Sequence, residues 1–146
     1  MNEENPSYVE FITGEGGVID TWLRRGAAGF RLDVADELPD DFIEKIRAAV
    51  KRVSPEKFLL GEVWEDATTK YGFGQRRTYL LGKGLDSVMN YPFKNAVLDF
   101  VKGKPAEQAM TEILTICEHY PAPAMDTALN FLSTHDTERA LTVIAD

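Results

Sequence analysis

Three apolar runs in this chain each look like a buried β-strand, and an acidic residue follows each run. The acids are Asp33 in GFRLDVADE, Glu62 in FLLGEVWED and Asp136 in LNFLSTHDTER. Helical patterns separate the runs, which favours parallel pairing of the strands through crossover connections. The sequence therefore predicts an α/β fold in which three carboxylates gather at the carboxyl-terminal edge of one sheet.

Hydrophobic periodicity, glycine and proline predict the remaining order of elements. Strands are predicted over residues 27–34, 58–63, 85–89 and 127–132. Helices are predicted over residues 6–25 with a break at the glycines, from Leu38-Pro39-Asp40-Asp41 to Val53, and over 93–101, 106–120 and 137–145. Residues 66–84 are charged and contain glycines, with a helix predicted in their second half. Inward positions are predicted for Phe100 on one helix and for the lone cysteine, Cys117, as a small apolar filler on the next.

Length and charge limit the class of protein. The 146 residues fit one domain, residues 1–146, but are too few for a complete eight-stranded α/β barrel, which needs about 250 residues. The formal net charge of −8 would repel a phosphate-rich partner, so we expect no nucleic acid partner. No apolar stretch approaches the roughly 20 residues of a membrane span, and the first residues lack the pattern of a signal peptide, so we expect no membrane partner.

The predicted strands place specific side chains together. Side chains alternate across a strand, so Arg31 and Asp33 share one face, and Glu62 shares a face with Leu60 on the next strand. Neighbouring strands lie about 4.8 Å apart, which allows carboxyls at their ends to approach the roughly 5 to 5.5 Å separation of a retaining glycosidase. One acid would attack the sugar and the other would protonate the leaving oxygen. We expect Arg31 to keep Asp33 ionised and burial to favour protonation of Glu62.

Each of these residues also has a simpler interpretation. Asp33 could cap the following helix, with Arg31 as a plain ion-pair partner. Glu62 could belong to a solvated acidic loop, and His135-Asp136 could form a turn. Trp64 could be a core residue rather than a platform for a sugar ring. Three acids that each follow a predicted strand would arise by chance much less often than any one of them alone.

Signature segments add a family resemblance. The runs GFRLDVA (29–35), GEVW (61–64) and STHDTER (133–139) resemble, in their usual order, three segments of the α-amylase superfamily of glycoside hydrolases. MNYPF (89–93) and Asp36-Glu37 further resemble the neopullulanase and cyclomaltodextrinase branch. The resemblance covers almost the whole chain. It implies a partial (β/α)8 TIM barrel, with strands four to seven and their helices.

The resemblance also implies roles for individual residues. Asp33 would be the nucleophile, Glu62 the general acid and base, and Asp136 the third carboxylate, which holds sugar hydroxyls. Arg31 and His135 would assist at the same subsite. We assign Trp64 and Glu37 to substrate binding. These seven residues are the candidate site.

The resemblance makes calcium possible in a longer parent protein but does not support a cofactor for this chain. Glu37 stands where the family often has a histidine whose backbone helps to hold calcium. A calcium requirement is therefore not carried over, and no metal site or cofactor is expected.

Two functions follow as hypotheses. The chain is a segment of a retaining hydrolase that acts on α-linked glucans such as maltodextrin, cyclodextrin or pullulan, and the segment alone is expected to be inactive. The alternative is a non-catalytic carbohydrate-binding or structural half-barrel that assembles with itself or a partner. Four parallel strands leave two open sheet edges, through which two copies could form a homo-oligomer.

Overall fold

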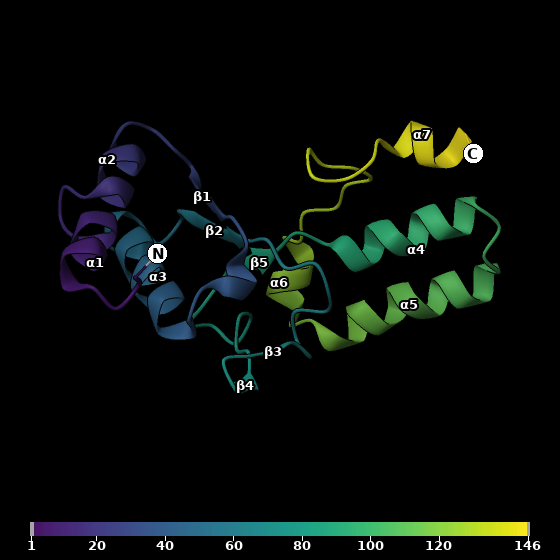
Figure 1. The fold of residues 1–146 in the computed structure, drawn as a ribbon, viewed down its shortest axis with the longest axis horizontal. Coiled ribbons are helices and arrows are strands. Elements are labelled where there is room, and N and C mark those ends of the chain that lie inside the picture. Colours follow the sequence, from purple (N-terminus) through teal and green to yellow (C-terminus); the bar gives the residue numbers. More distant parts are fainter. Residues whose placement is uncertain (1, 146) are drawn as a thin grey trace.

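A short parallel sheet lies at the centre of the computed structural model, which describes residues 2–145 (Figure 1). The sheet contains β1 (Gly29–Leu32), β2 (Phe58–Gly61) and β5 (Ser87–Val88), in the order β1-β2-β5, and both strand pairs are parallel. A parallel bridge between Met89 and Leu129 extends the pairing to the segment predicted as a fourth strand. The predicted fold class, a partial α/β barrel, is confirmed.

Helices make up most of the rest of the described chain. They are α1 (Pro6–Thr13), α2 (Val18–Arg24), the 3-10 turn η1 (Ala35–Glu37), α3 (Asp40–Val53), α4 (Tyr91–Val101), α5 (Ala106–His119), α6 (Ala122–Asp126) and α7 (Ala140–Ala145). The predicted helix over residues 6–25 is broken at its glycines, as expected. No helix within residues 2–145 is long and apolar enough to cross a membrane.

Two predicted elements differ from the structure. The helix predicted in the second half of residues 66–84 is wrong, because the segment instead contains the antiparallel pair β3 (Tyr71–Gly72) and β4 (Gln75–Arg76). The strand predicted over residues 127–132 is reduced to the single bridge at Leu129. Helix α5 ends at His119, ahead of Pro121 and Pro123, and a short helix that the sequence did not predict, α6, begins between these two prolines. Proline suits this place because its fixed φ matches the first helical turn and its missing N–H would have no partner there.

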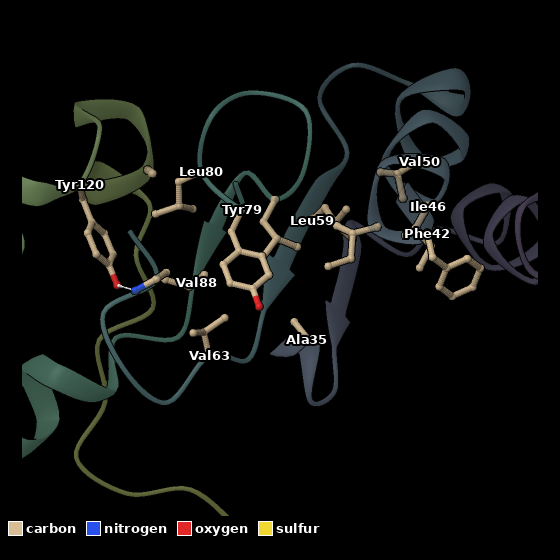
Figure 2. Close-up of a cluster of buried hydrophobic side chains, with 14 of the residues drawn as sticks. Ala35, Phe42, Ile46, Val50, Leu59, Val63, Tyr79, Leu80, Val88 and Tyr120 are labelled. Atoms are coloured by element: carbon tan, nitrogen blue, oxygen red, sulfur yellow. Dashed lines mark hydrogen bonds between the residues drawn. The ribbon is translucent and has the colours of Figure 1, made fainter. Parts of the chain in front are cut away.

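Strand alternation divides the apolar side chains of β2 between two clusters. Leu59 lies with Val50 and Ile46 of α3 in the main core, which continues past Tyr79 to Tyr120 (Figure 2). Leu60 lies on the opposite face, in a smaller cluster with Met89 and Tyr91, against which Phe58 and Phe131 also pack. Glu62 follows Leu60 by two residues, so the pleat directs its side chain to the face of the smaller cluster.

The hairpin of α4 and α5 extends away from the sheet (Figure 1). The two helices pack mainly against each other, and large side chains on them remain about half exposed. The inward positions predicted for Phe100 and Cys117 are wrong, because both residues are exposed. Their apolar patterns describe faces that no other described element covers.

Candidate active site

The ends of β1 and β2 place Asp33 and Glu62 side by side. The last paired residues of the two strands are Leu32 and Gly61, and each acid is the next residue along its strand. The Glu62 N–H still donates to the Leu32 carbonyl at 2.9 Å, and the Ala35 N–H donates to the Glu62 carbonyl at 3.1 Å. Both acids therefore lie at the carboxyl-terminal edge of the sheet, as predicted.

The guanidinium group of Arg31 contacts both acids. Its Nη1 donates to Asp33 Oδ1, and its Nη2 lies 3.0 Å from Glu62 Oε2. The second contact is an ion pair by distance, because buried Nη2 makes no well-aligned hydrogen bond within the described residues. Since each contact spans about 3 Å and the guanidinium fork is narrower still, the nearest oxygens of the two acids are at most about 8 Å apart. This upper limit is compatible with the separation of glycosidase carboxylates, roughly 5 to 9.5 Å.

The two acids lie in contrasting surroundings. The Asp33 side chain is 73% exposed, whereas the Glu62 side chain is 4% exposed. Glu62 Oε2 accepts a hydrogen bond from the Val34 N–H at 2.8 Å, and Oε1 accepts one from Trp64 Nε1 at 2.9 Å. The Tyr91 hydroxyl lies 3.4 Å from Oε1. Glu62 is thus fixed by surrounding donors, while Asp33 is open to an incoming molecule.

The Val34 hydrogen bond depends on an unusual backbone conformation. Val34 has φ 43° and ψ 53°, which lie in the left-handed region. A β-branched residue rarely adopts this conformation, and such strain costs of order 1 to 3 kcal/mol. The turn between Asp33 and η1 holds this strain next to both acids, as is common at functional sites.

Aromatic rings form one wall of the site. Trp64 stacks on Tyr91 with ring centroids 4.5 Å apart and an angle of 13° between the planes. Phe131 meets Tyr91 edge-on at 4.8 Å. Trp64 is 45% exposed, so it is not a core residue, and its face could receive the apolar side of a pyranose.

Tyr91 also connects Glu62 to the segment that carries Asp136. Burial is the main cause that raises the pKa of Tyr91, and the negative charges of Glu62 and Asp136 act in the same direction. An interaction with the Thr134 side chain opposes this increase. Asp136 is therefore within electrostatic reach of the ring that touches Glu62.

The remaining predicted site residues lie farther out. The Asp136 N–H donates to Thr134 Oγ1 at 3.2 Å, and His135 Nε2 lies 3.1 Å from Asp136 Oδ2, so this pair does adopt a turn. Both side chains are substantially exposed, and within residues 2–145 neither contacts Arg31. Glu37 is exposed on η1, and the structure does not bring it into contact with the other site residues.

Sequence reasoning missed two contributors to this site. The MNYPF motif contains Tyr91, but the sequence alone assigned this residue no role. Its position two residues after Met89 would place both side chains on the same face of an extended strand. The hydrogen bond from the Val34 N–H to Glu62 could not be predicted, because it depends on a backbone conformation that valine rarely adopts. Residues 2–145 contain no group of three or more His, Cys, Asp or Glu side chains that could hold a metal ion.

Comparisons with known proteins identify the family of this chain. A family model described as alpha amylase, catalytic domain, matches residues 1–146. The chain is 35% identical to a cyclomaltodextrinase from a Bacillus species over 97% of its length, and 35% identical to neopullulanase 2 of Thermoactinomyces vulgaris, also over 97%.

A solved structure shows the same arrangement of elements. The cyclic α-maltosyl-(1→6)-maltose hydrolase from Arthrobacter globiformis superposes on 99% of this chain with a TM-score of 0.87 and 29% identity. The chain covers 30% of that structure, and it spans 24% and 23% of the lengths of the two curated relatives.

Proposed function

The chain belongs to the α-amylase catalytic-domain family, and from this membership we propose that it carries the catalytic edge of a retaining hydrolase of α-linked glucans. The observation that supports the proposal most strongly is the contact of Arg31 with both Asp33 and Glu62 at the ends of adjacent parallel strands. In α/β barrels this edge is where catalytic residues from several strands converge.

The contrast in exposure between the two acids supports the roles that we propose for them. The carboxylate of exposed Asp33, paired with Arg31, attacks the anomeric carbon while the bond from that carbon to the leaving oxygen breaks. Glu62 gives its proton to that oxygen. Glu62 then takes a proton from water, the water oxygen bonds to the same carbon, and Asp33 is released. The reaction uses protein carboxyls and water, with no cofactor.

Other residues of the site would hold the sugar. Asp136 and His135, exposed on the turn after Phe131, are suited to accept and donate hydrogen bonds to sugar hydroxyls. Trp64 offers a half-exposed aromatic face beside Glu62. The names of the relatives refer to cyclomaltodextrin, pullulan and an α-1,6-linked maltose ring. We propose maltodextrin, cyclodextrin or pullulan fragments as the substrate class.

The 146-residue chain by itself is proposed to be inactive. Strand β1 lies at one edge of the sheet, and Asp33 projects into solvent rather than into an enclosed pocket. A glycosidase gains rate from a site that excludes water and distorts the sugar, which an open edge does not provide. Sugar binding through Trp64 without hydrolysis is the second function that the structure supports for the isolated chain.

A chimera tests the catalytic proposal. The 146 residues replace the matched segment of the Bacillus cyclomaltodextrinase, and hydrolysis of a maltooligosaccharide is compared with that of an aryl maltoside. Asp33→Asn should reduce kcat on both substrates by at least about a thousandfold. Glu62→Gln should cost much less on the aryl maltoside, because its leaving group needs little protonation. Asp41→Asn, on the exposed face of α3, is the control.

The outcomes separate the two functions. If either Asp33→Asn or Glu62→Gln keeps more than a small fraction of the maltooligosaccharide rate, the assigned roles are wrong. For the isolated chain, a maltodextrin titration followed by Trp fluorescence should show weak binding. The same chain should show no turnover of the aryl maltoside. Turnover comparable to that of a complete relative would refute the proposal that the chain alone is inactive.

A further inference from the structure

Four groups surround the carboxyl of Glu62, and one differs chemically from the other three. Arg31, the Val34 N–H and the Trp64 indole N–H lie 3.0, 2.8 and 2.9 Å from its oxygens, and all three can only donate. The Tyr91 phenol, 3.4 Å from Oε1, can donate or accept. Among the polar contacts of Glu62 in the described residues, Tyr91 alone can accept a hydrogen bond from its protonated form.

We propose that Tyr91 is a positioning residue that gives the carboxyl of Glu62 a hydrogen-bond partner in both protonation states. The inference rests on the function proposed above, in which Glu62 alternates between acid and base. When Glu62 is ionised, the phenol donates to Oε1. When Oε1 carries the proton, Oε1 donates to the phenol oxygen, and the phenol turns its own hydrogen away. Tyr91 stays neutral, and no proton passes between the two residues.

The surroundings of Tyr91 suit this role. The residue is 1% exposed, and its ring is held between the stacked Trp64 and the edge-on Phe131. Burial raises the pKa of Tyr91, so the phenol keeps its proton at neutral pH. The Thr134 side chain, which also interacts with the phenol, is a hydroxyl that can accept the hydrogen when it turns away from Glu62.

The 3.4 Å distance is long for a bond between two oxygens. Hydrogen bonds at catalytic groups are often long in the unbound state and shorten when substrate or a proton arrives. With three donors already on the ionised carboxylate, a fourth contributes little. The phenol therefore matters most when Glu62 is protonated and requires an acceptor.

Other charges act on Glu62 and must be held constant in a test. Arg31 reaches it from β1, with Asp33 on the other side of the same guanidinium group. Asp136, whose charge acts on the Tyr91 phenol, and the adjacent His135 lie on the segment whose Leu129 bridges to Met89. Tyr91→Phe changes none of these groups and keeps the stacked ring, so a changed titration of Glu62 would report the phenol hydroxyl.

The test is a carboxyl-carbon NMR titration of Glu62 in the 146-residue chain, with the resonance identified by its loss in Glu62→Gln. In Tyr91→Phe the ionised carboxyl keeps three donors, whereas the protonated carboxyl has no acceptor. The titration midpoint should move to lower pH by about half a unit to one unit. Tyr120→Phe is the matched control, since its buried hydroxyl bonds to the Ala67 N–H at 3.3 Å, away from the site. An unchanged or higher midpoint in Tyr91→Phe overturns the proposal.

Two further measurements complete the test. If Tyr91→Phe does not fold, 3-fluorotyrosine in place of all tyrosines weakens the phenol as an acceptor while keeping its packing. The midpoint must then fall, and an unmoved midpoint overturns the proposal. In the chimera, the alkaline limb of the kcat/KM profile should shift to lower pH in Tyr91→Phe. An inactive wild-type chimera would count against the proposed function, while the NMR titration would still decide the role of Tyr91.

Discussion

At the scale of single residues, Asp33 and Glu62 show that the exposure of a side chain depends on its neighbours in space rather than on its position in the sequence. Both acids follow the last paired residue of their strands. Glu62 is covered by Trp64 and Tyr91, while Asp33 follows β1 at the edge of the sheet. The sequence predicted that the acids would meet, because strand ends and alternation are local. Their contrast in exposure depends on which distant residues cover them.

Val34 permits a direct test of stored strain. We expect Val34→Gly to raise the free energy of unfolding by up to about 1 kcal/mol, because relief of left-handed strain exceeds the entropy cost of glycine. Little packing is lost, since Val34 is 42% exposed. The N–H that donates to Glu62 is retained. Urea unfolding of the chain measures the difference.

Val34→Ala is the matched control for this substitution. Alanine removes the β-branch but keeps a Cβ, which is also unfavourable in the left-handed region, so its stability should stay near that of the original chain. If Val34→Gly is clearly less stable than both proteins, the Val34 side chain contributes packing that outweighs the strain.

At the scale of elements, the helices and strands with a regular hydrophobic period were the ones that the sequence predicted well. Helix α3 was predicted closely because its apolar residues recur at helical spacing between a proline start and Ser54. The β3–β4 hairpin was missed because its two-residue turn is Phe73-Gly74, both at positive φ. Such turns normally carry asparagine or aspartate at the first position. The guanidinium of Arg77 lies 5.2 Å from the Phe73 ring and also donates to Asp40, 37 residues earlier in the chain, a long-range contact that no local pattern reveals.

Asp86 joins α3 to the sheet, and its removal should weaken that junction. Its carboxylate accepts hydrogen bonds from Arg47 at 2.7 Å, from Lys51 at 2.8 Å and from the Leu59 N–H at 2.8 Å. Asp86→Asn leaves two cations without their partner, so we expect a loss of about 2 kcal/mol at neutral pH. Urea unfolding measures the loss. Asp41→Asn, which removes an exposed pair with Lys45 on the same helix, should cost at most about 0.5 kcal/mol.

The Asp86 effect should depend on pH with a definite sign. Burial acts to raise the pKa of Asp86, but the bonds from Lys51, Arg47 and Leu59 outweigh it and hold the pKa below its ordinary value of 3.8. A lowered folded pKa gives stabilisation that is present above the unfolded pKa, about 3.9, and is lost as pH falls through the folded pKa. The stability difference between the chain and Asp86→Asn should therefore be full at pH 6 and shrink below about pH 4. A difference that persists at pH 2 would contradict this account.

At the scale of the whole molecule, the arrangement leaves apolar surfaces uncovered. Strand β1 forms one edge of the sheet, and the α4–α5 hairpin extends away from the sheet on the side of β5 (Figure 1). Met110 and Leu114 on this hairpin are about half exposed. The sequence predicted the partial barrel and its open edges, because four apolar runs are too few strands to close an eight-stranded barrel. It did not predict that the α5 stripe would remain exposed, because an amphipathic pattern does not identify the surface that covers it.

These surfaces should make the isolated chain associate with itself at micromolar concentration. Contiguous apolar patches and open strand edges both favour contact between copies. In light scattering, the mean mass of the 146-residue chain should therefore rise with concentration. The double substitution Met110→Glu with Leu114→Lys replaces apolar area with a charge pair in the favourable order on a helix, so helical content should be kept.

The response of the mass to this double substitution distinguishes helix contacts from strand-edge contacts. If the α5 face carries the association, the double variant should stay close to the monomer mass where the original chain does not. Gln108→Glu, an exposed polar position on the same helix, adds charge without removing apolar area and should associate like the original chain. Association that is unchanged in the double variant would assign the contact to the sheet edge at β1. A clean monomer for the original chain across the micromolar range would show that neither surface drives self-assembly.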